Sequence, residues 1–435
     1  MRLRLTGLHL SRPAESAGPS PGRQGGRVQP AGAGGGSVRS SRARAAIAVM
    51  FFSDGAIFGT WVSRVPAIEA HVHARTGPLG LALLGIAVGA LLSRQVAGQL
   101  VVRMGSRVIV RIGIALCCVM LPLPALAANV TMLGIALTGF GVALGLLDVA
   151  INANGVAVQD LMGRPVMSSF HGIYSVGGLT GSVAGGQAVA AGASPFLHFF
   201  LVAIILACVT LLVSSWLLPP SGIVAREPEA RRGWARLPPR YRAALFLLGF
   251  VGLCSMVGEG AVGDWGAIYM HTDLGASFSF ASSGFAAYSL AMAAGRLFGD
   301  RFVARWGGLR VITRSAALAG AGFAVALLIG KPAAAICGFT VLGLGLSSVI
   351  PVTFSMAGRL GDEVAGPAIT VVSSIAVMGS LAGPPVIGFV AEVVGLPSAL
   401  GLVSILAFAA AGLIWAVKPM REPVHAGRAE AAPVP

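Results

Sequence analysis

The chain has 435 residues, of which 55% are apolar and 11% are charged. Its mean hydropathy of +0.83 means more apolar surface than a soluble core can bury, so the composition excludes a soluble globular domain and indicates a membrane protein. The net charge of +15 comes from arginines in the tails and in alternate loops, which favours topology signals over nucleic-acid binding.

The start of the chain is rich in Gly, Pro, Ser and Arg without an apolar period, so we expect a disordered tail over 1–43. A start site assigned too early would explain residues 1–40 equally well. Twelve apolar segments follow, each about 20 residues long and thus able to cross the hydrocarbon core as a helix. They are expected near 44–64, 78–101, 107–127, 130–158, 166–190, 196–218, 243–269, 278–303, 309–329, 332–358, 365–390 and 396–417.

An internal duplication organises these segments. Arg296 follows Arg94 at an offset of 202 (296 − 94 = 202), and other residues repeat at this offset. Examples are Arg103 with Arg305, Gly105 with Gly307, Asp160 with Asp362 and Gly177 with Gly379. The sequence therefore predicts an all-α membrane protein with two pseudo-symmetric six-helix bundles. The predicted parts are the tail, the bundles 44–218 and 243–418, a basic linker at 219–242 and a second tail at 419–435.

Arginine placement predicts the orientation in the membrane. Basic residues cluster in the N-terminal tail, the linker and the turns near 103–111 and 301–314, whereas the opposite turns carry few. Basic loops stay on the cytoplasmic side. We therefore expect a multi-pass protein of the cell membrane with both termini in the cytoplasm.

Two carboxyl groups inside apolar segments are candidate proton carriers. Asp54 lies about ten residues, or ~15 Å, into the first segment, and Glu259 lies at the matching place in the second half, each followed by Gly and Ala. An ionised group at this depth is costly without a partner or a wet cavity, and such a carboxyl is suited to take up and release a proton. The alternative is an acid that only ties helices together. For Asp264, nearer the outer surface, both interpretations stay open.

A second polar group lies in the fourth and fifth apolar segments of the first half. Asp148 and Asn152 are four residues apart and share a helix face, and Asn154 is close by. A short turn joins these segments, so the helices pack antiparallel and His171 and Tyr174 reach a similar depth. Such a group suits hydroxyl binding or proton transfer, with Asp148 as a third proton-coupling candidate. A satisfied interhelical network is the alternative.

The turn after the second segment resembles the loop motif of the major facilitator superfamily. Arg103, Gly105 and Arg107 match the motif, but Val102 stands where the family has Asp. The resemblance implies a gating role for these residues, and the missing acid weakens it. Gly105 itself suits a tight turn.

The second copy of this motif contains Arg296, Asp300 and Arg305, for which the resemblance also implies gating. Its acid lies two residues closer to Arg296 than expected. From the residues alone, we expect Arg94 and Arg296 to extend towards lipid headgroups rather than to a substrate.

The stretch 177–186 resembles the superfamily's antiporter motif, with Ser182 where Pro is usual. The complete Gly-Pro form lies at 379–385. Small residues four apart allow close helix packing, so we expect hinge and packing roles.

The chain resembles the fucose-permease-like members of the superfamily, a branch that includes uncharacterised bacterial inner-membrane proteins. The likeness is carried by three stretches, 59–66, 169–178 and 259–265. The resemblance spans about 44–418. It implies proton coupling and sugar binding through acids of the first and fourth segments, here Asp54 and Asp148. Aromatic contacts to a sugar ring are expected from Trp61, Trp265 or Tyr269, although Trp near a helix end is as often an interfacial anchor.

These features predict a secondary transporter of a small organic solute, driven by protons, with symport favoured, and working as a monomer in lipid. Proton-driven drug or metabolite efflux is the first alternative, and a non-transporting membrane sensor is the second; sodium coupling also stays open. No nucleophile–base pair, phosphate loop or metal-ligand spacing is found in the sequence, so we expect neither an enzyme nor a cofactor.

Overall fold

The computed structural model describes residues 33–163, 166–219, 239–358 and 362–417, and the regular elements in these ranges are helical. The first half contains α1 (Ala33–Val62), α2 (Val65–Val72), α3 (Thr76–Met104), α4 (Ser106–Met120), α5 (Val130–Met162), α6 (Met167–Ala190) and α7 (Pro195–Val213). The second half contains α9 (Pro239–Ile268), α10 (Phe278–Trp306), α11 (Gly308–Ile329), α12 (Pro332–Leu346), α13 (Val349–Gly358), α14 (Asp362–Val394) and α15 (Leu396–Leu413). Short helical turns occur at η1 (Leu123–Leu126), η2 (Ser214–Trp216), η3 (Tyr269–Asp273) and η4 (Ile414–Ala416).

The predicted membrane crossings are present. Ten described segments are long and apolar enough to span a bilayer, one of them formed by α12 and α13 together. Helices α6 and α10 occupy the two remaining predicted places. Both are rich in Gly and Ser, which lowers their hydropathy, and both lie where the two halves meet.

Several predicted boundaries differ from the structure. Helix α1 already begins at Ala33, so the tail predicted over 1–43 is wrong for residues 33–43; Ala43 is fully buried and Arg42 lies over the Trp216 ring, which ties this part of α1 to the bundle. Helix α9 begins at Pro239, inside the predicted linker. Helix α2 was not predicted at all. Residues 1–32, 220–238 and 418–435 lie outside the described residues.

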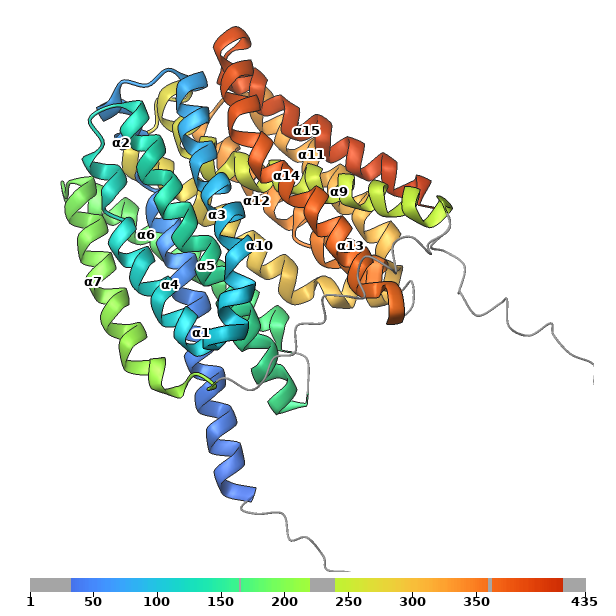
Figure 1. The fold of residues 1–435 in the computed structure, drawn as a ribbon. Coiled ribbons are helices and arrows are strands. Elements are labelled where there is room, and N and C mark those ends of the chain that lie inside the picture. Colours follow the sequence, from blue (N-terminus) through green and yellow to red (C-terminus); the bar gives the residue numbers. More distant parts are fainter. Residues whose placement is uncertain (1–32, 164–165, 220–238, 359–361, 418–435) are drawn as a thin grey trace, which may run out of the picture.

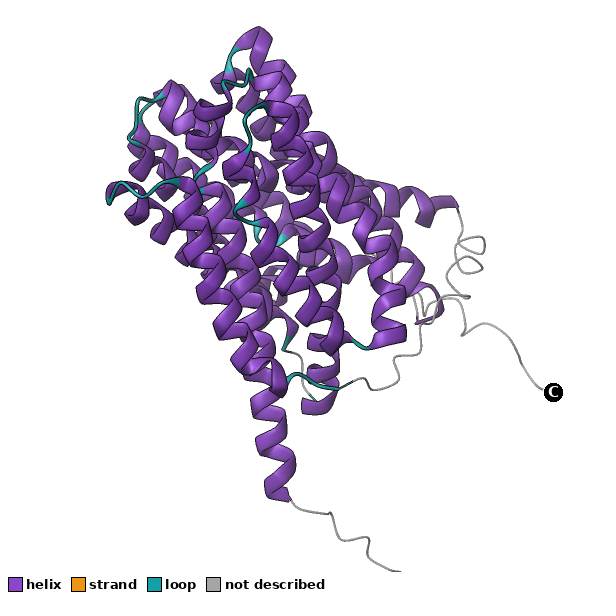
Figure 2. Ribbon diagram, turned by 60° about the vertical axis from the view of Figure 1, so that its left-hand side comes forward, coloured by secondary structure: helices purple, strands orange, loops and turns teal. Residues whose placement is uncertain are grey.

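The two halves lie side by side and repeat the same helix pairings (Figure 1). Helix α1 packs along α6 in the first half, as α9 packs along α14 in the second. The halves meet where α3 packs along α14 and α6 packs along α10. Figure 2 shows the same arrangement of long helices from the side. We call the face where α1 begins the terminal face and the opposite one the distal face.

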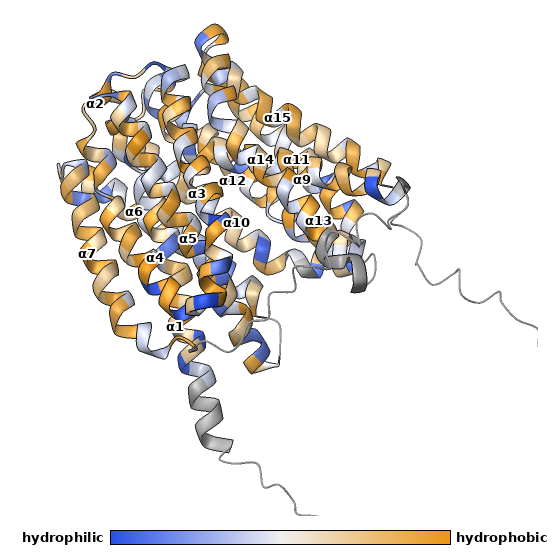
Figure 3. Cartoon of the chain, in the orientation of Figure 1, coloured by the Kyte–Doolittle hydropathy of each residue, from blue (hydrophilic) through white to orange (hydrophobic). Residues whose placement is uncertain are grey.

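The outer surface has the character that a bilayer requires. Leu211 and Leu212 on α7 are 74% and 76% exposed, and Figure 3 shows apolar residues along outer helices such as α7 and α15. Lipid covers such surfaces in a membrane protein.

The turns near the terminal face repeat as the duplication predicts. Gly105 between α3 and α4 has φ of 83°, and Gly307 between α10 and α11 has φ of 81°. This backbone region favours glycine, which explains why both copies have it there. Arg107 and Arg111 donate hydrogen bonds to the carbonyls of Ser215 and Ser214 at the end of α7, so these arginines bind helix carbonyl ends.

Candidate functional site

Glycines bring α1 and α6 into backbone contact and thereby place the first candidate acid. A Cβ at Gly55 would overlap the carbonyl oxygen of Tyr174, and a Cβ at Gly59 would overlap that of Gly178. Close approach of this kind requires small residues. It holds Asp54 of α1 beside Tyr174 of α6, whose ring experiences the Asp54 charge.

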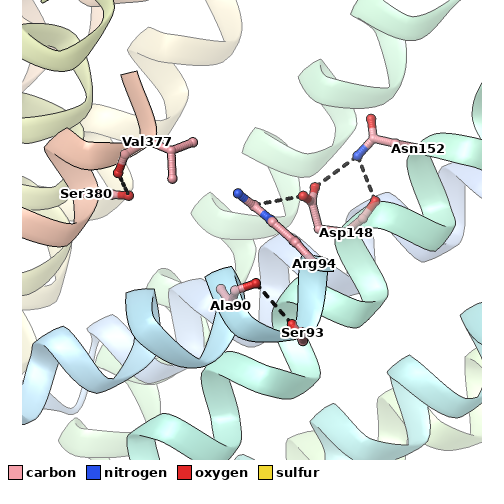
Figure 4. A network of polar contacts seen from close by, with 7 residues as sticks. All are labelled: Ala90, Ser93, Arg94, Asp148, Asn152, Val377 and Ser380. Carbon is pink, nitrogen blue, oxygen red and sulfur yellow. Dashed lines mark hydrogen bonds and ion pairs between the residues drawn. The ribbon is translucent and has the colours of Figure 1, made fainter. Parts of the chain in front are cut away.

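The first charged pair joins α3 and α5. Arg94 Nη2 lies 2.8 Å from Asp148 Oδ2, and Asn152 Nδ2 donates a hydrogen bond of 2.9 Å to Asp148 Oδ1. Figure 4 shows the Arg94 side chain extended onto the Asp148 carboxylate, with Asn152 on its other side. Both carboxylate oxygens therefore have donors.

Asp54 lies beside this pair without a bond to it. The side chain is only 7% exposed, and the charges of Asp148 and Arg94 both act on it. In the described part of the chain, no hydrogen bond or ion pair is found for its carboxyl group. Arg94 thus has one acid in contact and a second acid close by.

The second charged pair belongs to the other half. Arg296 Nη2 of α10 lies 3.8 Å from Glu259 Oε1 of α9, and Arg296 Nη1 donates a hydrogen bond of 3.2 Å to Ser175 Oγ of α6. Arg296 therefore connects its own half to the other one. The acids predicted for proton coupling, Asp54, Asp148 and Glu259, all lie in this central group of charged residues.

His171 and Tyr174 on α6 join the two pairs. His171 packs edge-on against the Phe51 ring, with 5.3 Å between centroids, and experiences the charges of Arg296 and Asp148. Tyr174 experiences the charges of acids from both halves, Asp54 and Glu259. Tyr288 of α10 experiences the charges of Glu259 and Arg296. We call the set Asp54, Arg94, Asp148, Asn152, His171, Tyr174, Glu259, Tyr288 and Arg296 the central cluster.

Three sequence-based predictions about placement are wrong. Arg94 and Arg296 do not extend to headgroups but turn inward, because acids at matching depth stabilise the guanidinium groups there. Asn154 is fully buried and binds Ser106 Oγ and the Leu218 carbonyl, away from the central cluster. It lies two residues from Asn152 and therefore on another face of α5.

The tryptophans also lie elsewhere. Trp61 is fully buried and packs against Phe140 and Phe199. Trp265 is fully buried and borders Gly388 of α14. Both fill the helix packing on the distal side of the central cluster, so the structure does not place them as solute contacts.

The remaining predicted residues differ in position. Asp264 is half-buried on α9, and its carboxylate lies near Gly260, one turn from Glu259. Arg103 and Arg305 are exposed at the terminal face. The Asp300 side chain lies outside the described part of the structure.

The central cluster is closed towards the distal face. Ser182 Oγ donates a hydrogen bond of 2.6 Å to the Ser282 carbonyl, and Ser279 Oγ donates one of 2.9 Å to the Gly186 carbonyl, both between α6 and α10. Arg75 and Glu392 form an ion pair of 3.6 Å between α3 and α14. These contacts between the halves all lie on the distal side of the central cluster.

Sequence reasoning missed several of these residues. Tyr288 on α10 experiences the charges of Glu259 and Arg296, and Ser175 accepts the Arg296 hydrogen bond. Their depth, close to that of Glu259, was the available signal. Ser182, noted only as a departure from a motif, forms a hydrogen bond between the halves.

Comparisons with known proteins agree with this architecture. A family model described as Major Facilitator Superfamily matches residues 248–435. The chain is 33% identical over 358 residues to an uncharacterized MFS-type transporter of Yersinia pestis, covering 82% of this chain and 91% of the relative. It is 31% identical over 355 residues to the membrane protein MosC of Rhizobium meliloti, covering 82% of this chain and 85% of that protein.

Solved structures share the fold at low identity. The nucleoside transporter NupG superposes with a TM-score of 0.67 at 12% identity, over 87% of this chain and 99% of that one. The fucose:proton symporter FucP of Escherichia coli gives a TM-score of 0.57 at 18% identity, over 86% and 98% of the two chains. With the duplicated six-helix halves, the charged pairs between the helices and relatives above 30% identity, the chain belongs to the major facilitator superfamily of membrane transporters.

Proposed function

We propose that the protein is a proton-coupled symporter of a small organic solute in the cell membrane, with both termini in the cytoplasm. The observation that carries the proposal is the central cluster: three acids and two arginines at mid-depth, contributed by both halves. Charged residues inside a membrane are costly and mark the pathways of ions, protons or solutes.

The arrangement of the cluster supports a proton-driven exchange of partners. Arg94 contacts Asp148 and lies near Asp54, so a proton on one acid favours pairing of Arg94 with the other. Arg296 bonds to Ser175 of the opposite half, so a change in its pairing with Glu259 acts on the contact between the halves. Protonation is thereby linked to the relative position of the halves, as alternating access requires.

The distal closure supports one particular state of the cycle. Under the proposed orientation, the distal face is the outer one, so the serine contacts and the Arg75–Glu392 pair close the site to the outside. Release of these contacts opens the site outward. The solute of the symporter FucP is fucose, and that of NupG is a nucleoside, so polar small molecules are the first solutes to test.

The test is solute-induced proton movement in proteoliposomes that contain a pH-sensitive dye, with solutes first selected by thermal stabilisation of the purified protein. Symport predicts that an added solute carries protons inward with it, and that Asp54→Asn and Glu259→Gln abolish this signal while the protein still binds the solute. Asp160→Asn, an exposed acid outside the cluster, is the matched control. Proton movement opposite to the solute indicates antiport, and unchanged movement in both variants overturns the proposal.

A further inference from the structure

The Arg296–Glu259 pair is looser than its counterpart. The nearest atoms are 3.8 Å apart, beyond hydrogen-bond length, whereas Arg94 and Asp148 are 2.8 Å apart. The structure gives Arg296 a single hydrogen bond among the described residues, to Ser175 Oγ. A guanidinium group has five N–H donors in a planar fork, so most donors of Arg296 are available.

Tyr288 adds a second unused donor. Its side chain is only 2% exposed, and its hydroxyl has no hydrogen-bond partner in the described structure. Tyr288 lies eight residues before Arg296 on α10, a spacing that puts both residues on one face of the helix, and the charges of Arg296 and Glu259 both act on it. A buried hydroxyl without a partner is unfavourable, so a ligand atom that accepts its hydrogen bond would be stabilised there.

Together these donors select an acceptor with negative charge. The guanidinium fork binds a carboxylate through two parallel hydrogen bonds, and a tyrosine hydroxyl donates a third. A neutral hydroxyl would satisfy one of these donors but would not match the charge. Both halves contribute residues to this site, because Ser175 and Tyr174 of α6 lie beside Arg296.

The charges of the central cluster explain how an anion and a proton would bind together. With every group ionised, the cluster has three acids and two arginines and already carries an excess negative charge. A solute carboxylate beside Arg296 and ionised Glu259 would place two anions on one cation at low dielectric, which is unfavourable. A proton on Glu259 removes this repulsion and frees Arg296.

We propose that the solute is an organic anion whose carboxylate binds Arg296 and Tyr288, and that Glu259 takes up a proton as it binds. This inference rests on the proposed symport and names its substrate class. A monocarboxylate would then cross with one proton and without net charge, so the membrane potential would not drive its uptake.

The test is binding of matched probes to the purified full-length protein in nanodiscs. Gluconate is compared with glucose, lactate with lactamide, and glucosamine serves as a cationic probe, each at millimolar concentration. Carboxylates are expected to bind, and their affinity is expected to rise about tenfold per unit of falling pH while Glu259 is ionised.

Three variants separate the roles. Arg296→Gln is expected to weaken carboxylate binding at least about tenfold, and Tyr288→Phe several-fold. Glu259→Gln is expected to bind carboxylates at least as well as the native chain and without the pH dependence. Arg301→Gln, an exposed arginine five residues further along α10, is the matched control and should change neither.

Other results overturn the inference. The inference is wrong if no carboxylate binds, whether or not glucose or glucosamine does. It is also wrong if Arg296→Gln leaves carboxylate binding unchanged. Proton movement in proteoliposomes distinguishes the two proposals. A neutral solute that moves protons leaves symport standing and rejects the anion, whereas carboxylates that bind and cross without protons reject symport.

Discussion

The two halves place an arginine at the same position of their repeat but surround it differently. Arg94 is in direct contact with Asp148, which Asn152 also holds. Arg296 stands apart from Glu259 and bonds to the opposite half through Ser175. Both halves thus have arginine at this position of the repeat, but the second half has Ile350 where the first has Asp148. The arginine of the first half therefore has a charged hydrogen-bond partner, whereas the arginine of the second half has only a neutral one, the Ser175 hydroxyl.

Helix packing differs in the same sense. In the first half, Gly55 and Gly59 of α1 contact the backbone of α6. The corresponding glycines of α9, Gly260 and Gly263, have only side-chain atoms near them, at 3.7 and 3.4 Å. The glycines beside the acid of α1 thus meet backbone atoms of α6, whereas those beside the acid of α9 meet only side-chain atoms.

The largest expected effect tests this packing difference. Gly59→Ala places a methyl group onto the Gly178 carbonyl oxygen, which is backbone and cannot rotate away. We expect a loss of stability of about 3 kcal/mol or more, or failure to fold. Gly263→Ala meets only the Phe58 ring edge at 3.4 Å and should change stability by less than about 1 kcal/mol. Thermal unfolding followed by size-exclusion fluorescence measures both, and similar losses in the two variants would contradict the comparison.

The second effect concerns the buried amide of the first half. Asn154→Ala leaves the Leu218 carbonyl and Ser106 without their donor, so we expect a loss of about 2 kcal/mol. The matching position in the second half is the half-buried Met356, where Met356→Ala should cost about 1 kcal/mol. Neither variant should alter the pH dependence of uptake. A changed pH dependence in Asn154→Ala would return this residue to the functional site.

Much of this comparison could be predicted from the sequence. Apolar segment length fixed the crossings, because each helix must satisfy its own backbone in the membrane. The repeat at a constant offset predicted the symmetric halves, and the cost of a charge in hydrocarbon identified Asp54 and Glu259. These inferences depend on properties that each segment has by itself.

What the sequence left undetermined depends on contacts between segments. Arg94 pairs with Asp148 only because α3 and α5 meet. Considered within its own segment, Arg94 was expected to extend towards lipid headgroups. Asn154 was grouped with Asn152 because the two are close in the chain, although a helix turns them to different sides. Tyr288 became a candidate only because Arg296 lies two turns away on the same helix and Glu259 lies on a neighbouring helix. Residue type indicated the chemistry, and helix phase decided which residues share a site.

A double-mutant cycle sharpens the contrast between the two arginines. Arg94→Gln and Asp148→Asn, singly and together, should give a coupling free energy of about 1 kcal/mol, since the pair is in contact but more than a third exposed. Arg296→Gln with Glu259→Gln should give less than about 0.5 kcal/mol at the same pH. Thermal unfolding in the absence of solute measures both cycles. Equal coupling free energies in the two cycles would contradict the difference between the pair in direct contact and the pair that stands apart.

The smallest expected effect lies where the halves approach each other at the distal face. Burial, with the nearby negative charge of Asp273, raises the pKa of Glu69 to about 7 from its ordinary 4.5. Glu69 lies on α2 of the first half and Asp273 follows α9 of the second, so this repulsion acts between the halves. A raised carboxyl pKa means that the closed state holds the proton more tightly than the open or unfolded chain. Its stability should therefore be greatest below pH 4.5, fall as the pH rises to about 7, and stay constant above that.

Partial exposure of Glu69 limits its pH-dependent contribution to the free energy of unfolding to about 1 kcal/mol. Glu69→Gln should remove it and flatten the dependence of the unfolding temperature on pH in this window, while Asp273→Asn should reduce it in part. Asp160→Asn, near the terminal face, is the control and should follow the native curve. Parallel curves for Glu69→Gln and the native chain would show that the distal acids do not act across the halves, and would leave the central cluster as the site where protonation acts on the contact between them.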